Sequence, residues 1–525
     1  MSIRQHAARV ALLMAVSAGM QAWLVAHTEI LFADGLRYIA QARQLDEGHW
    51  SDALVRAVDH PVYPAAVAAV HRGLIDGSSP QDWQLSAQAA SALFGVLIVI
   101  PIYLVGLELF GATSAWLACI FVTLTPLWGH VFADALSEST CLFFWTFGLW
   151  TALRFLREGR FFWLPLTILA GGLSYWTRPE GALLPAALAA TLLMMPFSRS
   201  IRLHWPRWWA AVGLLVIGPA LVIGPYLALR GGVGTKPAVA RLLGLAPKSA
   251  ALAVERERPL DPDQSMLKTA ILAARATALA VGGATSWPLV PLALLGFLTA
   301  SRGSDEEPSY RARRRLLLAI LLAASLLALM RLHATGGYCT PRHAMMPSLV
   351  LLIAAAGAVA RIVGNWHIDG ARLGLGEGTF HAGPAAWAAV VVALFAINAG
   401  GLFAPINRGM RGYRDAGEWI AAHVPAEARV VDVTGWTQYY SGRPGYTFAT
   451  LIAAPGDPAL RWVVVRDAHL HGPWDYCTKL RALVDGLEPV ESYPPVHKKG
   501  YAQVYIYDRL SPRRSVAHAD VDASR

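Results

Sequence analysis

Charged residues are scarce in this chain of 525 residues. They make up 15% of the sequence, whereas hydrophobic residues make up 55% and soluble domains carry about 25% charge. The mean hydropathy is +0.41. The scarcity of charge excludes an ordinary soluble protein and indicates an integral membrane protein.

The sequence also lacks several motifs that would indicate other functions. It has no Cys-x-x-Cys or His-rich pairing typical of a structural zinc site, and no Gly-rich phosphate loop precedes a helix predicted in its tail. An internal repeat is absent as well, which weakens an interpretation as a transporter of inverted halves. No basic stripe alternates with aromatic residues in a soluble segment, so the net charge of +10 does not indicate nucleic-acid binding.

Cysteines are few, and only four are present. Cys119 and Cys141 lie in apolar runs, where a buried thiol is expected. Cys339 and Cys477 are both predicted on the outer side of the membrane, where an oxidising compartment would permit a disulfide between them. Two separate thiols fit the sequence equally well.

Long apolar runs are what the chain does contain. Each has close to the roughly 20 residues that a helix needs to cross a bilayer, and we count about eleven. They lie near 10–32, 84–108, 112–130, 137–154, 162–177, 181–197, 208–229, 285–301, 315–332, 343–361 and 386–404. The first resembles a signal peptide, but its core is long and no clean cleavage site follows, so we expect a retained anchor. The predicted fold class is a polytopic α-helical membrane protein with a transmembrane domain over 1–404.

Basic residues at the ends of these runs predict the orientation, because cytoplasmic segments are enriched in arginine and lysine. A cytoplasmic N-terminus places five groups of basic residues in cytoplasmic segments. These groups are Arg4 and Arg9; Arg154, Arg157 and Arg160; Arg199, Arg202 and Arg207; Arg302 and Arg311 to Arg315; and Arg361 and Arg372. The loops 33–83 and 230–284 and the tail from 405 are then extracytoplasmic.

The two long outer loops differ in character. The loop 33–83 contains two amphipathic stretches, 34–46 and 61–75, of the kind that lie in the membrane interface. The loop 230–284 begins with glycines, becomes strongly charged and ends in another amphipathic stretch, which is typical of a lid.

The tail has an ordinary globular composition. Helices are predicted at 413–423 and 476–485, and they alternate with strands at 429–434, 461–466 and 502–508. This alternation predicts a small extracytoplasmic α/β domain over 405–510. Residues 511–525 are expected to be a disordered tail.

Ionisable residues recur at the ends of the runs that are predicted to face outward. They form five groups: Asp34; Asp59 with His60; Asp134 with Glu138; Arg178 with Glu180; and Arg342 with His343. A single charge at a membrane boundary is usually interfacial, but charge there is costly and five groups on one face indicate a functional site. A carboxylate can act as a general base, and arginines bind phosphate through two hydrogen bonds. The mixture suits transfer of a group from a phosphate-bearing lipid, with cations stabilising the departing phosphate.

Four segments carry a family resemblance. They are Asp34-Gly35-Leu36-Arg37-Tyr38 with Gly48-His49-Trp50; HPVYP at 60–64; ADALSE at 133–138; and YWTRPEG at 175–181 with GGYCTPRHAMMP at 336–347. They resemble motifs of the GT-C glycosyltransferases that use polyprenyl-phosphate sugars, above all the protein O-mannosyltransferase-like and lipid A aminoarabinose transferase-like groups. The resemblance covers about residues 8–405.

The resemblance implies a role for each acidic residue. Asp34 would be the catalytic base, although it could instead cap the interfacial helix. Asp134 and Glu138 would orient the acceptor or the sugar, although they could instead cap a helix start. Asp59 and Glu180 would line the substrate site.

The resemblance also implies the contacts of the donor. Arg342, Arg178 and His60 would bind its phosphate, and Arg178 could instead be an interfacial arginine paired to Glu180. Tyr338 would line the site, although an aromatic belt residue fits that position too.

Three departures from the family pattern leave the sugar and the acceptor open. Gly35 follows Asp34 where many relatives have a second acid, so Asp59 or Glu138 would have to replace it. His60 stands where some relatives have lysine, and His343 replaces the usual tyrosine after Arg342.

Together these observations predict an inverting hexosyl- or pentosyltransferase of the cell envelope. It would move a sugar from a polyprenyl-phosphate donor to a hydroxyl on a lipid, glycan or protein acceptor, at the outer face of the cytoplasmic (inner) membrane. The expected partners are that donor, that acceptor and membrane lipid, without nucleic acid. No residue is assigned to a metal and no cofactor is required, although the carboxylates leave a divalent ion open.

Two alternatives remain. A non-enzymatic flippase or transporter of lipid-linked sugars would carry ionisable residues at mid-span and on both faces. A ligase that joins preassembled glycans would use the same donor chemistry.

Overall fold

The computed structural model describes residues 2–197, 205–232, 240, 244–245, 265–299, 307–364, 367–369, 379–381, 383–472 and 474–511. The chain divides into two compact units. The first comprises Met1–Ala26 with Arg37–Ala404, and the second comprises His27–Leu36 with Pro405–Arg525. Most of residues 233–264, within the loop expected at 230–284, and residues 512–525 lie outside the described residues.

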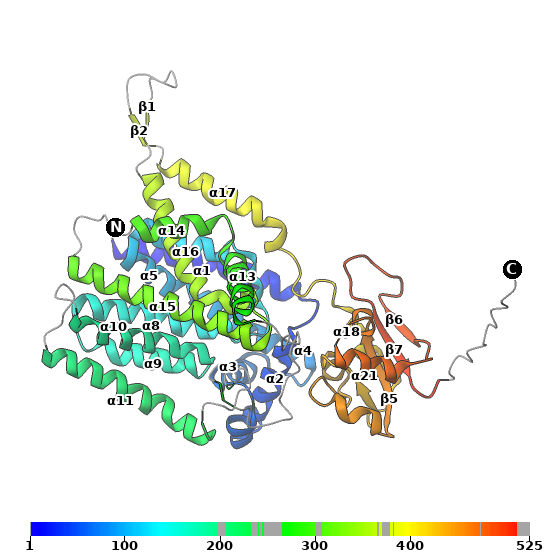
Figure 1. Cartoon of the computed structure of the whole chain (residues 1–525). Coiled ribbons are helices and arrows are strands. Elements are labelled where there is room, and N and C mark those ends of the chain that lie inside the picture. Colours follow the sequence, from blue (N-terminus) through cyan, green and yellow to red (C-terminus); the bar gives the residue numbers. More distant parts are fainter. Residues whose placement is uncertain are drawn as a thin grey trace. The chain divides into compact units, whose positions relative to one another are not determined.

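The first unit is a bundle of helices (Figure 1). Its longer helices are α1 (Ile3–Ala26), α2 (Ala33–Asp46), α3 (Val62–Val70), α4 (Pro80–Leu97), α5 (Val99–Phe110), α6 (Ala112–Thr123), α7 (Pro126–Ala133), α8 (Glu138–Glu158), α9 (Trp163–Tyr175), α10 (Leu183–Met194), α11 (Trp205–Leu229), α13 (Met266–Thr285), α14 (Leu289–Thr299), α15 (Pro308–Gly336), α16 (Met345–Gly364) and α17 (Gly383–Leu402). The two amphipathic stretches expected in the first outer loop are both helical, as α2 and α3.

Short elements join these helices. Five are single turns of π or 3₁₀ helix, and two are strands that pair as an antiparallel hairpin between α16 and α17. The turns are η1 (Asp52–Arg56), η2 (His71–Ile75), η3 (Pro179–Ala182), η4 (Met195–Phe197) and η7 (Pro341–Ala344), and the strands are β1 (His367–Asp369) and β2 (Thr379–His381).

Apolar helices of sufficient length confirm a multi-pass membrane protein. Eight in the described part of the chain are long and apolar enough to cross a bilayer, and α6 with α7 makes a ninth if this pair, bent by 68°, is one span. The runs expected to cross at 137–154 and 162–177 correspond to α8 and α9, which are not among these eight helices. The count of about eleven spans therefore stays a prediction.

One helix differs from expectation. We expected the sequence of α13 to lie at the membrane surface, but this helix of 20 residues is apolar enough to cross. Only Lys268 and Arg275 interrupt its Ala- and Leu-rich sequence. The run counted as a span at 285–301 instead forms α14, a helix of 11 residues.

Small residues let the helices of the bundle approach closely. Helices α8, α9, α10 and α15 lie side by side, and α16 packs against α14 and α6 (Figure 1). A methyl group on Gly106 would meet the backbone of Ala115 at less than 3 Å, and one on Gly296 would meet Ala354. Close packing of this kind brings helices that are distant in sequence together, and the candidate active site is built from the ends of such helices.

The second unit is built on a five-stranded sheet with strand order β4-β3-β5-β7-β6. The first three strands are parallel, and β7 pairs antiparallel with both β5 and β6. The strands are β3 (Arg429–Val431), β4 (Gly445–Tyr446), β5 (Leu460–Arg466), β6 (Glu491–Tyr493) and β7 (Val504–Asp508); the helices are α18 (Gly412–His423), α19 (Trp436–Ser441), η9 (Leu451–Gly456), α20 (Asp467–Leu470) and α21 (Asp475–Val484). The predicted small α/β tail is therefore present.

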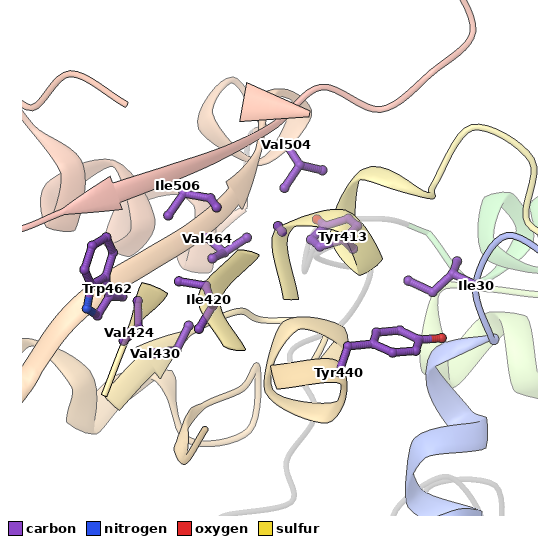
Figure 2. Packing of buried hydrophobic residues seen from close by; sticks show 11 residues of the cluster. Ile30, Tyr413, Ile420, Val424, Val430, Tyr440, Trp462, Val464, Val504 and Ile506 are labelled. Carbon is purple, nitrogen blue, oxygen red and sulfur yellow. The ribbon is translucent and has the colours of Figure 1, made fainter. Parts of the chain in front are cut away.

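Alternating side chains bury both faces of this sheet. Trp462 and Val464 of β5 pack with α18, and the intervening Val463 and Val465 pack with α21. Figure 2 shows the first of these cores, which also contains Ile30. The segment that follows α1 thus contributes to the core of the C-terminal unit, although it lies almost 400 residues earlier in the chain.

All four cysteines carry free thiols.

Candidate active site

The acidic motif at 133–138 forms a buried turn between two helices. Asp134 directly follows α7, and its Oδ1 accepts a hydrogen bond from the Ala135 N–H at 2.8 Å. Glu138 begins α8, where the free N–H groups of the first turn favour a carboxylate. Both side chains are buried, so each carboxylate needs a specific partner.

Two arginines from other helix ends converge on Glu138. Nη1 of Arg178 donates to Oε1 of Glu138 at 2.9 Å, and Nε of Arg342 donates to the same oxygen. The side chains of Glu138, Arg178 and Arg342 are 4%, 12% and 14% exposed. Nη2 of Arg178 also donates to Glu180 at 3.0 Å. The structure therefore brings together four of the predicted site residues, Glu138, Arg178, Glu180 and Arg342, as one ion cluster around the buried Glu138, which we call the Glu138 cluster.

Proline breaks place both arginines at the ends of helices. Arg178 precedes Pro179 and is extended, with φ −152° and ψ 142°, because a residue before proline is driven away from the helical region. Arg342 follows Pro341, and the preceding Thr340 is extended for the same reason. Each break ends one helix and begins the next, so both side chains sit at a junction.

Tyr338 and His343 border the cluster on either side of Arg342. Nδ1 of His343 lies 2.8 Å from Oγ1 of Thr340, which closes a capping box at the start of η7. The rings of Tyr338 and His343 are 5.4 Å apart. These contacts fix the turn from which Arg342 reaches Glu138.

A network of hydroxyl groups ties the acidic turn to α2 and α3. Oη of Tyr38 lies 2.9 Å from Oγ of Ser137, which also receives Nη1 of Arg178 at 3.4 Å. The rings of Tyr38 and Tyr63 meet edge to face at 5.0 Å. Burial raises the pKa of Tyr63 well above its usual value, and the charges of Asp134 and Glu138 raise it further. Tyr63 is therefore a neutral hydrogen-bonding group beside the carboxylates.

Asp59 and His60 lie beside the chain that carries Arg178. Oδ2 of Asp59 accepts a hydrogen bond from Nε of Arg37 at 2.9 Å, and Asp59 is 3% exposed. The buried ring of His60 lies 5.2 Å from that of Tyr175 and 5.6 Å from that of Tyr226. The N–H of Val62 donates to the carbonyl of Trp176 at 3.1 Å, two residues before Arg178.

Arg230 is a buried residue of this region that the sequence analysis did not select. It directly follows α11 and is 8% exposed. It donates to Oη of Tyr226 at 2.7 Å and to the carbonyl of Ala57 at 2.5 Å. Among the described residues it forms no ion pair with a carboxylate. The signal that pointed to Arg178 and Arg342, an arginine at the outer end of an apolar run, applies to Arg230 as well.

Asp34 is half-buried in the first turn of α2. With the rest of segment 27–36 it belongs to the second unit, whereas the residues from Arg37 onward belong to the first. Asp34 is therefore a residue of the C-terminal unit, and the members of the Glu138 cluster are residues of the first unit. In the described part of the chain, no three or more His, Cys, Asp or Glu side chains gather in a way that could hold a metal ion.

Comparison with known proteins identifies the fold. The family model of the dolichyl-phosphate-mannose-protein mannosyltransferases matches residues 59–223. ArnT from Cupriavidus metallidurans, solved with undecaprenyl phosphate bound, superposes with a TM-score of 0.58 at 14% identity, over 96% of this chain and 98% of ArnT. This chain has the GT-C fold.

Two structures from Archaeoglobus fulgidus share this GT-C fold. The apo oligosaccharyltransferase has a TM-score of 0.62 at 12% identity, over 93% of this chain and 73% of that one. The oligosaccharyltransferase AglB, in complex with an inhibitory peptide and a dolichol-phosphate, has a TM-score of 0.60 at 14% identity, over 90% and 70%. No curated protein matches this chain by sequence. The GT-C resemblance inferred from four short segments is confirmed, and the matched range 59–223 contains Glu138 and Arg178.

Proposed function

We propose that this protein is an inverting glycosyltransferase. It moves a hexose or pentose from a polyprenyl-phosphate donor to a hydroxyl group of a lipid, glycan or protein acceptor. The observation that carries the proposal is the Glu138 cluster, in which two buried arginines point at one acceptor oxygen. The known proteins of similar fold support it, since two of them hold an undecaprenyl phosphate or a dolichol-phosphate.

The arginines suit a phosphate for a geometric reason. A phosphate offers the same kind of negatively charged oxygens that Glu138 offers to Arg178 and Arg342, and guanidinium groups bind both through paired hydrogen bonds. In a site shielded from water, two such cations strongly stabilise a departing phosphate. We assign Arg178, Arg342 and His60 to the donor phosphate. We add Arg230, which pairs with no carboxylate among the described residues and is hydrogen-bonded to Tyr226, whose ring lies 5.6 Å from that of His60.

The proposed reaction is a single displacement. The carboxylate of Asp34 takes the proton of the acceptor hydroxyl as its oxygen bonds to the anomeric carbon. The bond from that carbon to the phosphate oxygen breaks, and its electron pair leaves with the polyprenyl phosphate. Attack opposite the leaving group inverts the anomeric configuration. Asp134 and Glu138 orient the acceptor or the sugar, and Asp59, Glu180 and Tyr338 line the substrate site.

The proposed location is the outer face of the cytoplasmic membrane, with the C-terminal unit on the same side. Two exposed residues test this orientation. Trp50 is 57% exposed in the first predicted outer loop, and Phe162 is 67% exposed in the predicted inner turn between α8 and α9. A membrane-impermeant thiol reagent should label Trp50→Cys in intact spheroplasts and Phe162→Cys only after lysis. Labelling in the reverse order would overturn the orientation.

The activity test uses the full chain in lipid nanodiscs with a panel of undecaprenyl-phosphate hexoses and pentoses. The readout is the release of undecaprenyl phosphate when an extract that contains acceptors is added. Asp34→Asn should lower the rate by about 1,000-fold or more, because the amide cannot accept the proton. Asp46→Asn is the matched control at the other end of α2, where Asp46 pairs with Arg72. If the Asp34→Asn variant turned over at the wild-type rate, Asp34 could not be the catalytic base.

A further inference from the structure

The segment that carries Asp34 folds as part of the C-terminal unit. Thr28 forms a parallel bridge with Ile406, and the N–H of Glu29 donates to the carbonyl of Ile406 at 3.1 Å. Ile30 is fully buried in the core that contains α18, at the end of that core where Tyr413 and Tyr440 lie (Figure 2). Residues Thr28 to Leu31 are thus bound to the C-terminal unit by backbone and core contacts.

Side chains of the C-terminal unit reinforce this attachment. Nδ2 of Asn407 donates to the carbonyl of Ile30 at 2.8 Å, and Nε1 of Trp436 donates to the carbonyl of Leu31 at 2.9 Å. The carboxylate of Glu29 accepts the N–H of Gly409 at 2.6 Å. Backbone carbonyls that a loop would leave to water are therefore bonded by residues from the far end of the chain.

Contacts continue on the other side of Asp34. The N–H of Gly35 donates to the carbonyl of Phe32 at 2.8 Å, which closes the turn into α2. A Cβ atom on Gly435 would lie 3.5 Å from Cδ1 of Leu36. Gly435 and Trp436 are adjacent, so one short stretch of the C-terminal unit meets the chain both before and after Asp34.

We propose that the C-terminal unit is a positioning element for Asp34, with Trp436 and Asn407 as its positioning residues. This inference rests on the role of Asp34 in the proposed function. The six-residue connection between α1 and α2, residues 27–32, would sample many conformations if it were free. Because Thr28 to Leu31 are bonded to the C-terminal unit and Leu36 lies next to Gly435 of that unit, the connection and the first turn of α2 are held in one conformation. The unit then acts on the rate of the chemical step and not on affinity for the donor.

The physical need for such an element is the narrow geometry of proton transfer. A general base must stand within hydrogen-bond reach of the hydroxyl, and displacement by about 1 Å can lower the rate by about 100-fold. Catalytic groups carried on loops need support from a rigid scaffold. Here the scaffold is the core of β5, β7 and α18, which contains Ile30 itself.

The test compares two tryptophans of this core. Trp436→Phe keeps a ring beside Tyr413, whose centroid lies 4.9 Å away, but removes the indole N–H that holds Leu31. Trp462→Phe is the matched control, because the buried indole N–H of Trp462 has no hydrogen-bond partner among the residues that the structure describes. In the full-length protein, Trp436→Phe should lower kcat by about 10-fold with KM for the donor within about twofold, and amides 28–36 should exchange about 10-fold faster. Trp462→Phe should change neither quantity.

Asn407→Asp is a second, independent variant. It preserves the shape of the side chain and suits the left-handed backbone at this position, where φ is 51°, but it replaces the donor facing Ile30 by an acceptor. It should reproduce the effect of Trp436→Phe on kcat and on amide exchange. Wild-type kcat in both variants would overturn the inference, as would slower turnover without faster exchange at 28–36. An active Asp34→Asn would instead overturn the proposed function, and the exchange data would then still report the attachment alone.

Discussion

Both ends of α8 carry the same arrangement, a buried glutamate held by two arginines. At its start, Glu138 binds Arg178 and Arg342. At its other end, Glu108 of α5 lies 3.5 Å from Nη1 of Arg154 and 3.2 Å from Nη1 of Arg157. Glu108 also accepts a hydrogen bond from Oη of Tyr310 at 2.8 Å. We call this second group the Glu108 cluster.

The two clusters differ in the exposure of their arginines. Arg178 and Arg342 are 12% and 14% exposed, whereas Arg154 and Arg157 are 30% and 54% exposed. Exposed arginines keep water and contribute little stability through an ion pair. Buried arginines lose water, and the attraction of their partner only offsets that loss. The Glu108 cluster is thus an ordinary interfacial arrangement, and the Glu138 cluster has a cost that stability alone does not explain.

The largest expected difference between the clusters is in stability. Glu138→Ala should lower the free energy of unfolding by about 3–5 kcal/mol, because it leaves two buried cations without their shared partner. Glu108→Ala should lower it by about 1 kcal/mol or less, since its arginines are solvated. Equilibrium unfolding of the full chain in mixed micelles measures both. Equal losses would show that exposure does not separate the two clusters.

The next difference concerns donor binding. Arg342→Ala should weaken binding of undecaprenyl phosphate by about 10- to 100-fold, the value of a charge-assisted hydrogen bond. Arg157→Ala is its match in the Glu108 cluster and should leave binding unchanged. Titration of each variant with the lipid in nanodiscs gives the two affinities. An unchanged affinity for Arg342→Ala would remove this residue from the donor site and would make the two clusters functionally alike.

The sequence predicted the members of the Glu138 cluster but not their pairing. Arg178 and Arg342 each stand out as an arginine beside proline at the outer end of an apolar run. That they bind the same oxygen of Glu138 depends on how α8, α9 and α15 pack, and no local pattern carries that information. Arg230 also stands at the outer end of an apolar run, but it was missed because no proline lies beside it.

The fold was predictable where periodicity is strong. In the tail, α18, α21, β3, β5 and β7 follow from alternation and helical spacing, as does α2 in the first outer loop, whereas the short elements β4, β6, α19, η9 and α20 were not predicted. Ile30 shows the limit, since its short apolar segment looks like the end of the first span and becomes part of a core only by pairing with residues beyond 400. Similarly, α13 has the composition of both an interfacial and a crossing helix, and its length as a continuous helix becomes evident only in the structure.

A smaller effect should show whether Glu138 competes with the donor phosphate for Arg178 and Arg342 or holds these arginines in place for it. Glu138→Gln keeps a hydrogen-bond acceptor for the arginines but removes the negative charge that competes with a phosphate. We therefore expect undecaprenyl phosphate to bind about 5-fold more tightly, a gain of about 1 kcal/mol. Glu108→Gln should leave the affinity as it is. Weaker binding by Glu138→Gln would mean that the charge of Glu138 holds Arg178 and Arg342 in the orientation that phosphate requires.

The smallest expected effect is the response to salt. Screening acts strongly on solvated charges and weakly on buried ones, so raising the salt from about 0.1 M to about 1 M should remove most of the stability lost in Glu108→Ala relative to the wild type. The loss in Glu138→Ala should persist at both concentrations, because Arg178 and Arg342 remain shielded from the ions. The same unfolding measurement gives both values. A loss at Glu138 that vanished with salt would show that water and ions reach this cluster, and the argument from its burial would then fail.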